Sequence, residues 1–356
     1  MNPLRTLRPL AIGIALVSIA VAGKASAGRN DLKLLNLCPQ GSSPALGTQE
    51  CRWVQRDANG LVTGVNIDSE GRSNFRSLMS ELGVVMAPRI PMPADTIGFA
   101  GFQVSGELGL TQIGNNKNYW NGVNAVSPQS PDAARPDSSL STVGVFLRKG
   151  MWFPAPSFEL GGGVVNLLDS QMLSWQGYAK FALHEGFHDL PFPSLAVRAA
   201  ISYLTGTDQV SLTTTSLDVI VSKGFGVLKT LRIEPFGGWS LLMIKAAGKK
   251  IDFTPLCDAR AVAQASPGQQ VSGCALAQSG NPGGPDDLKA NVAFPSQDII
   301  TRYRVFGGAK LKFGVLAVIA QYELYLAGHS RDENVISAVD QSGRQSSLSL
   351  STGIEF

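Results

Sequence analysis

The chain contains one motif whose residue types and spacing could do chemistry. His184-Glu185-Gly186-Phe187-His188 fits the pattern H-E-x-x-H. On a helix, histidines four residues apart share one face and can bind a zinc ion, and the glutamate then activates the metal-bound water. A zinc metallopeptidase would need His184 and His188 as metal ligands, so the secondary structure around them decides whether the motif can act.

The residues before this motif favour a strand. Between 173 and 183, apolar residues alternate with polar ones, which is the period of a strand. Gly186 inside the motif and Pro191 after it both disfavour a helix, and the third histidine, His329, is expected at the opposite end of the fold. We therefore predict a polar turn, with no catalytic residue, no bound metal and no cofactor. A zinc metallopeptidase remains the weaker alternative.

The four cysteines form two local pairs within Pro-, Gly- and Ser-rich sequence, Cys38 with Cys51 and Cys257 with Cys274. In an oxidising compartment such pairs indicate loop disulfides. Three connectivities are open, and local pairing is favoured because only loop-like residues separate the members of each pair. Zinc is the other use of four cysteines, but the C-x-x-C spacing that it prefers is absent.

The first 27 residues have the three parts of a cleaved export signal. Arg5 and Arg8 precede an apolar run over 10–23, and Ala25-Ser26-Ala27 follows as a small-residue cleavage site. Lys24 ends the apolar run before it reaches the roughly 20 residues of a membrane helix. Export without a membrane helix predicts either a secreted protein or an outer-membrane barrel of a Gram-negative bacterium.

The composition excludes one class of partner. The chain has 30 basic and 27 acidic residues, and the predicted signal contains three basic residues and no acidic one, which leaves 27 of each sign. A net charge near zero argues against nucleic acid as a partner. Charged residues make up only 16% of the chain and 39 residues are glycine, a balance that suits strands in a membrane.

A period of two dominates the chain after residue 96. Residues 303–313 alternate between an apolar face and a basic face, and residues 195–203 and 316–326 show the same pattern. Such alternation is typical of strands with one face on lipid and the other on water or packed polar groups. We predict about ten strands, with eight to twelve as the bounds: 97–112, 139–152, 157–167, 170–185, 194–205, 209–222, 228–245, 299–313, 315–328 and 346–356.

The connections between these strands favour a membrane barrel over a soluble sandwich. The three long connections, 113–138, 246–298 and 329–345, all follow odd-numbered strands. An up-and-down barrel that begins in the periplasm places odd connections outside the cell and keeps the even turns short. The sequence therefore predicts an all-β, antiparallel transmembrane barrel over 97–356 with long extracellular loops.

The last strand carries a more specific pattern. Leu348, Leu350 and Ile354 alternate with small or polar residues, and the chain stops at Phe356. This closely resembles the final strand of bacterial outer-membrane β-barrel proteins. The resemblance implies that the barrel-assembly machinery reads Leu348, Leu350, Ile354 and Phe356, and that outer-membrane lipid surrounds the barrel. It points to no functionally defined subfamily and identifies no extracellular partner.

Residues 28–96 follow a different plan. Phe75, Leu78, Met79 and Leu82 have helical spacing, with Ser73 as a candidate cap at the start and Gly83 at the end. We predict that this segment is a small periplasmic element or a plug in the barrel mouth, with a poorly ordered leader as the alternative.

The remaining functional candidates are charged residues that parity places in the lumen. Both signs are present, so the side chains can pair, and ten strands enclose little open space. We predict an outer-membrane barrel with a structural or surface-interaction role through its loops, with a narrow passive pore of slight anion preference, as in a porin, as the alternative. The predicted lumen charges are Lys180, Arg198, Arg232, Arg302, Arg304, Lys310, Lys312, Glu107, Glu159, Glu234, Glu323 and Glu355.

Overall fold

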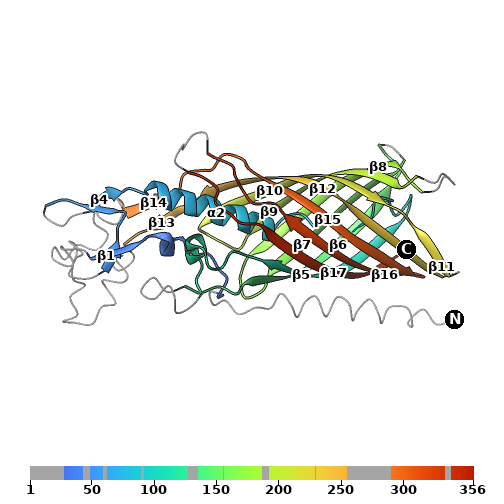
Figure 1. Cartoon of the computed structure of the whole chain (residues 1–356), viewed down its shortest axis with the longest axis horizontal. Coiled ribbons are helices and arrows are strands. Elements are labelled where there is room, and N and C mark those ends of the chain that lie inside the picture. Colours follow the sequence, from blue (N-terminus) through green and yellow to red (C-terminus); the bar gives the residue numbers. More distant parts are fainter. Residues whose placement is uncertain are drawn as a thin grey trace.

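A computed structural model describes residues 28–42, 49–58, 62–89, 92–126, 135–154, 156–186, 192–228, 230–254, 290–332 and 338–356. Ten antiparallel strands close into a barrel (Figure 1). Each strand pairs with the next along the chain, β10 pairs with β12, and the last strand closes the barrel on the first. The predicted ten-stranded up-and-down barrel is confirmed. Its strands are β5 (Phe102–Gln112), β6 (Ser139–Met151), β7 (Phe158–Leu167), β8 (Leu173–His184), β9 (Ser194–Thr205), β10 (Val210–Ser222), β12 (Leu231–Gly248), β15 (Ile300–Phe313), β16 (Leu316–Tyr325) and β17 (Gln345–Glu355).

The two faces of the barrel wall follow the alternation in the sequence. On β5, Leu108 and Leu110 are 60% and 50% exposed, while Glu107 and Thr111 on either side of them are buried in the interior. Large apolar side chains are exposed on the outer face of the other strands as well. A soluble protein rarely exposes an apolar surface of this extent, whereas a barrel in lipid requires one. The interior is the polar face.

The two ends of the barrel differ. β5 begins and β17 ends at the same end, where the backbones of Phe102 and Phe356 exchange two hydrogen bonds of 3.1 and 2.9 Å. The tight Phe313-Gly314-Val315 turn and a short additional strand that pairs with β12, β11 (Phe225–Leu228), lie at this end too. The three long connections leave the opposite end, which we call the mouth.

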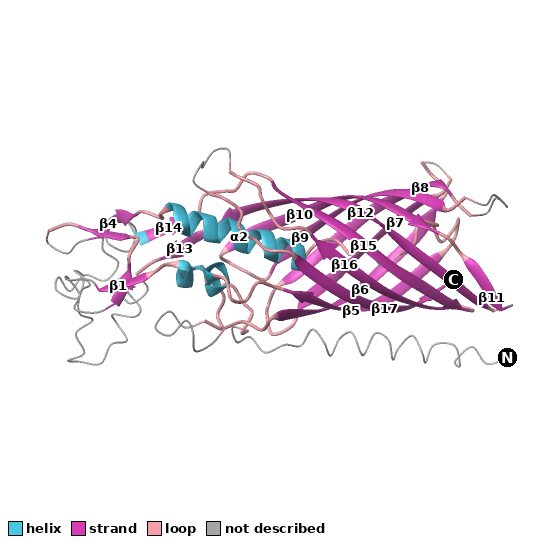
Figure 2. Ribbon diagram, viewed as in Figure 1, coloured by secondary structure: helices cyan, strands magenta, loops and turns pink. Residues whose placement is uncertain are grey.

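The mouth carries the N-terminal segment and small elements of the long connections (Figure 2). One helix, α2 (Ser69–Val85), runs from there into the barrel. No helix among the described residues is both long and apolar enough to cross a membrane. The other elements at the mouth are η2 (Leu34–Leu37), β1 (Gln40–Ser42), β2 (Gln49–Cys51), β3 (Val54–Arg56), β4 (Val62–Val65), η3 (Asn118–Gly122), β13 (Lys250–Asp252) and β14 (Asn291–Ala293).

Helix α2 has the predicted apolar face but different ends. Phe75, Leu78, Met79 and Leu82 are fully buried in the apolar core of the mouth. The helix begins at Ser69 because the carboxylate of Asp68 accepts a hydrogen bond from the N–H of Gly71 at 2.7 Å, so the prediction of Ser73 as the cap is wrong. It also continues past Gly83. A Cβ at Gly83 would lie 2.7 Å from the side chain of Ile244, so this glycine allows close packing on β12.

Candidate functional site

The barrel interior is the candidate site, and the N-terminal segment occupies it. After α2, residues 86–89 and 92–96 descend the lumen as an extended chain, which we call the strap. The carbonyl of Met86 accepts a hydrogen bond from Ser174 near the mouth end of β8, and Thr96 contacts Glu185 just beyond the other end of that strand. Residues 86–96 therefore contact both ends of β8 from inside the lumen.

At the mouth, Arg302 connects the barrel wall to α2. Its guanidinium donates to the hydroxyls of Ser80 and Ser342 at 2.9 and 2.6 Å, and also to the carbonyls of Leu326 and Gly343 at 2.9 Å each. Arg302 is 1% exposed, so these bonds replace water. One guanidinium thus joins the helix to both ends of the connection between β16 and β17.

A second junction at the mouth is built on Glu81, which is fully buried in α2. One carboxylate oxygen accepts from the hydroxyl of Tyr119 at 2.6 Å and from the N–H of Gly343 at 3.2 Å. The other accepts from the indole of Trp120 at 2.7 Å and the N–H of Gly114 at 2.9 Å. Burial, and secondarily the Glu81 carboxylate, raise the pKa of Tyr119 above its ordinary value. All four donors are neutral groups on loops, so Glu81 fastens those loops to the helix.

Lower in the lumen, two arginines hold the strap. Arg198 and Arg304 share the carboxylate of Asp218, at 2.7 and 3.1 Å. Arg198 also donates to the carbonyl of Arg89, and Arg304 donates to the carbonyl of Pro88 at 3.2 Å. All of these guanidinium groups are buried. The strand arginines therefore face carboxylates of the wall and backbone oxygens of the strap.

Arg89 of the strap forms an ion pair with the barrel wall. Its guanidinium lies 3.4 Å from Glu107 of β5 and donates to Thr142 of β6 at 2.8 Å. Further down, the ammonium of Lys180 donates to the carbonyls of Pro93 and Asp95 at 3.2 and 2.9 Å. The strap is thus bonded to β5, β6 and β8 of the barrel wall.

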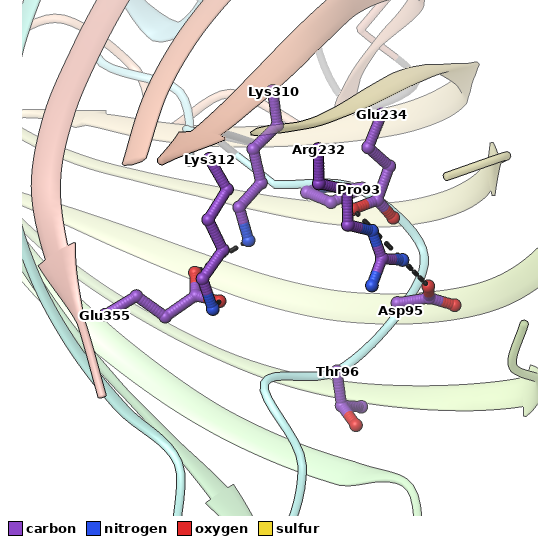
Figure 3. Close-up of a pocket in the computed structure, with 8 residues that line it drawn as sticks. All are labelled: Pro93, Asp95, Thr96, Arg232, Glu234, Lys310, Lys312 and Glu355. Carbon is purple, nitrogen blue, oxygen red and sulfur yellow. Dashed lines mark hydrogen bonds and ion pairs between the residues drawn. The ribbon is translucent and has the colours of Figure 1, made fainter. Parts of the chain in front are cut away.

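At the end opposite the mouth, the lumen opens into a small pocket (Figure 3). Glu355 receives Lys310 at 2.6 Å and Lys312 at 2.8 Å on its two oxygens, and Arg232 donates to Asp95 of the strap at 2.9 Å. Three cations and three carboxylates line this pocket, so its charges balance. The complete lining is Pro93, Asp95, Thr96, Arg232, Glu234, Lys310, Lys312 and Glu355.

The H-E-x-x-H motif begins on a strand. His184 is the last residue of β8, Glu185 follows it, and His188 lies outside the described residues. Glu185 is buried and accepts hydrogen bonds from the N–H of Thr96 at 2.8 Å and from the hydroxyls of Thr96 and Ser157 at 2.5 and 2.6 Å, while most of the predicted turn lies outside the described residues. Among the described residues, no three His, Cys, Asp or Glu side chains gather as a metal site.

The structure places all twelve lumen candidates on the inner face. Ten of them are buried, whereas Arg232 and Lys312 are partly exposed at the pocket. Sequence analysis missed Arg148 and Asp218, although both alternate with outward apolar residues and parity could have found them. It also missed Arg76, Glu81 and Arg89, which precede the first strand of the barrel and show no period of two.

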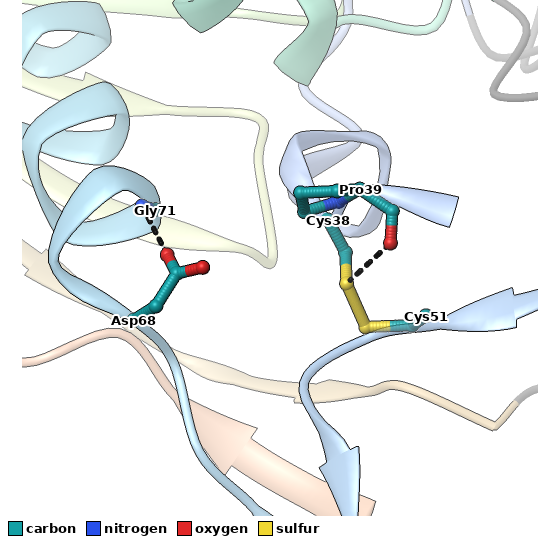
Figure 4. The surroundings of a disulfide bond; sticks show 5 residues. All are labelled: Cys38, Pro39, Cys51, Asp68 and Gly71. Carbon is teal, nitrogen blue, oxygen red and sulfur yellow. Dashed lines mark hydrogen bonds between the residues drawn. A yellow bond between two sulfur atoms is a disulfide. The ribbon is translucent and has the colours of Figure 1, made fainter. Parts of the chain in front are cut away.

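The predicted disulfide between Cys38 and Cys51 is confirmed (Figure 4). It closes the segment beside the start of α2, where Asp68 caps the helix. Cys257 and Cys274 lie outside the described residues. The predicted assembly signal, Leu348, Leu350, Ile354 and Phe356, lies on the outer face of β17 and at its end, exposed.

Comparisons with known proteins give matches of low identity and low TM-score. No protein-family profile matches the chain, and no curated protein does. Neisserial surface protein A shares 9% identity and covers 72% of this chain and 97% of its own, with a TM-score of 0.27. An outer membrane channel from Pseudomonas putida F1 shares 10%, covers 75% and 100%, and has a TM-score of 0.29. The outer membrane protease OmpT from Escherichia coli shares 6%, covers 76% and 99%, and has a TM-score of 0.28.

These scores are too low to transfer a function, and the three matched proteins have different roles. The fold is established by the chain's own structure, which has a closed antiparallel barrel, an apolar outer face and a polar interior. These are the features that a barrel spanning an outer membrane requires. The chain folds as a ten-stranded β-barrel of the outer-membrane type, and the strap lies in its lumen.

Proposed function

We propose that this protein is a closed outer-membrane barrel that acts at the cell surface through the segment and loops at its mouth. The observation that carries the proposal is the filled lumen. Arg198, Arg304 and Lys180, the basic side chains that would line a pore, donate to carbonyl oxygens of the strap. A passive pore with anion preference would need these cations to face water.

Four hydrogen bonds from Arg198, Arg304 and Lys180 to the strap backbone involve a charged donor, and such bonds are stronger than those between neutral groups. They favour the state in which the strap stays in the lumen.

The orientation follows from the connections. Short turns face the periplasm and long loops face the outside in bacterial barrels. The end that contains Phe102, Phe356 and the Phe313-Gly314-Val315 turn is then periplasmic, and the mouth is extracellular. The cap, defined as the described residues of 28–68, projects from the extracellular side. Lipid contacts the apolar wall, and the assembly machinery recognises β17 through Leu348, Leu350, Ile354 and Phe356.

The proposal includes no enzymatic activity and no cofactor. The carboxylate of Glu185 accepts hydrogen bonds from Thr96 and Ser157, which fixes the strap where it leaves the lumen. This is a structural role, and it supports the choice of a binding protein over a zinc metallopeptidase. The extracellular partner is a molecule that contacts the cap.

Single-channel conductance in a planar bilayer tests the closure. Wild-type protein should show no sustained current, whereas a variant that lacks residues 28–96 behind the same signal should conduct. Equal, steady conductance of both proteins would refute the closed barrel.

A second variant covers the case in which the deletion does not fold. The hydroxyl oxygens of Ser80 and Ser342 lie 3.0 Å apart, so Ser80→Cys with Ser342→Cys should allow α2 to be tethered to the wall. Oxidised and reduced samples of this variant should both be silent. A current in the reduced sample that disappears on oxidation would show that the plug leaves the lumen at rest.

A further inference from the structure

The strap runs the length of the lumen in one direction. Along β8, Ser174, Gln176 and Lys180 contact strap residues 86, 87 and 93 in that order. Along β10, Thr214 donates to the carbonyl of Gly83, and Ser222 accepts from the N–H of Ala94. Both walls therefore show the same descent. The chain enters at the mouth with α2 and leaves at the opposite end, directly before β5 (Figure 1).

The cap lies beyond the mouth and is anchored there. The N–H of Asn30 donates to the carbonyl of Asp169 in the β7–β8 turn at 2.9 Å, and Leu32 forms a β-bridge with Val123. The N–H of Lys33 donates to Gly122 at 2.8 Å. Residues 28–33 thus lie at the end of the barrel opposite to Phe102, the first residue of β5.

The extracellular position of residues 28–33 requires this segment to cross the membrane, because an exported chain first reaches the periplasm. The predicted signal in residues 1–27 delivers the chain to the periplasm. The barrel begins and ends at the periplasmic end, but the residues that follow the signal lie at the extracellular end. The covalent path between them passes through the lumen.

We propose that the barrel exports its own N-terminal segment through its lumen and displays it outside, with α2 and the strap as the remaining trace of that passage. The barrel would in this way be a carrier for any flexible polypeptide joined ahead of Gly28. The inference rests on the orientation in the proposed function and adds to it the route and the nature of the cargo.

The width of the lumen limits which polypeptides can pass through it. Arg89 reaches β5 and β6 from the strap, while Arg198 and Arg304 reach the strap from β9 and β15. Side chains from several sides thus meet a single extended chain. A helix with its side chains is about 10–12 Å wide. The lumen holds one helix or one extended segment, and a folded domain exceeds this width.

Epitope tags in three positions of the full chain test the route. The first tag precedes Gly28, the second lies in the connection between Thr254 and Ala290, and the third replaces Gly314 in the periplasmic turn. On intact cells, antibody should label the first two tags, and protease should remove their signal. The third tag should be reached only after the outer membrane is permeabilised.

The remaining outcomes separate the two proposals. A labelled connection tag with a protected N-terminal tag would overturn the export of the segment while the orientation stands. A labelled turn tag with a protected connection tag would overturn the orientation and with it the proposed function. Each protein must show the heat-dependent gel mobility of a closed barrel before labelling is compared.

The cargo itself provides a second test. A flexible peptide of about 100 residues ahead of Gly28 should be displayed as well as the tag alone. A matched domain of the same length, locked by its own disulfide in the periplasm, should lower the surface signal at least tenfold, and a reductant during synthesis should restore it. Equal display of the locked and flexible cargo would overturn passage through the lumen.

Discussion

Replacement of Glu81 by Gln should loosen the loops at the mouth from α2. The carboxylate accepts four hydrogen bonds, two on each oxygen. An amide retains one acceptor oxygen and places an NH2 group at the other position. The hydroxyl of Tyr119 can rotate to accept from that NH2 group. The N–H of Gly343 cannot, so it loses its acceptor.

The expected magnitude follows from these four contacts. One hydrogen bond to a charged acceptor disappears, and the other contacts change from a charged to a neutral partner. Loss of a hydrogen bond to a charged group costs about 1.5 to 3 kcal/mol, and the weakened contacts add to this. We expect the free energy of local opening at the mouth to fall by about 3 kcal/mol. At about 1.4 kcal/mol per factor of ten, the open population should rise by about 100-fold.

Hydrogen exchange measured on peptides from residues 114–122 and around Gly343 reports this opening. Exchange in these peptides should accelerate by about two orders of magnitude, with β8 and β9 unchanged. Glu70→Gln is the matched control, because Glu70 is an exposed residue in the first turn of the same helix. Exchange of the mouth peptides within threefold of wild type in Glu81→Gln would refute the role of Glu81, and so would an equal change in the control.

The same junction predicts a dependence on pH. The pKa of Tyr119 is raised in the folded protein, so the folded state holds the phenol proton more tightly than the open state does. The stability from this group is present below the ordinary phenol pKa of about 10 and is lost as pH rises above it. Hydrogen exchange of the mouth peptides, corrected for the intrinsic exchange rate at each pH, should accelerate above about pH 10 in wild type. The acceleration should be smaller in Tyr119→Phe.

Three further predictions concern the wall and its assembly. Asp218→Asn leaves two buried arginines without a shared carboxylate, so it should lower the temperature of the gel-mobility shift, while exposed Asp208→Asn should leave it unchanged. Deletion of Phe356 should lower outer-membrane assembly far more than deletion of three residues within 277–284, and equal losses would count against the terminal signal. Glu185→Gln should destabilise the strap where it leaves the lumen by about 1–3 kcal/mol. Purified wild-type protein should lack stoichiometric zinc. One zinc per chain, with a peptidase activity that is lost in this variant, would contradict the structural role of Glu185.

The barrel could be predicted because its physical requirements are repeated in every strand. A wall between lipid and a polar interior needs a period of two, and residues 303–313 show it without ambiguity. The same parity indicates which side chains face the lumen, and Lys180 and Glu159 lie 3.4 Å apart there. Arg148 obeys the same parity and is buried in the interior.

The plug could be predicted only in part because its contacts are not periodic. The apolar face of α2 follows helical spacing, so the sequence predicts this helix. The strap is too short and too rich in proline to show a period, and nothing local in Arg89 indicates that its partner is Glu107 of β5. Burial of Glu185 depends on Thr96, a residue 89 positions away. Such pairings arise from the path of the chain, which the sequence pattern of either partner does not contain.

The basic character of the lumen has a physical explanation in the strap. An extended chain in a closed barrel cannot form a regular ladder with all of the strands around it, so its carbonyl oxygens need side-chain donors. Proline at 88 and 93 removes two backbone N–H groups that would otherwise need acceptors. Arg and Lys only donate, and Arg198, Arg304 and Lys180 supply donors at these carbonyls. Inward basic residues therefore indicate anion preference in an empty lumen and backbone binding in an occupied one. A proline-rich segment ahead of the first strand is the sequence feature that distinguishes the two cases, because it brings carbonyl oxygens into the lumen with few competing donors.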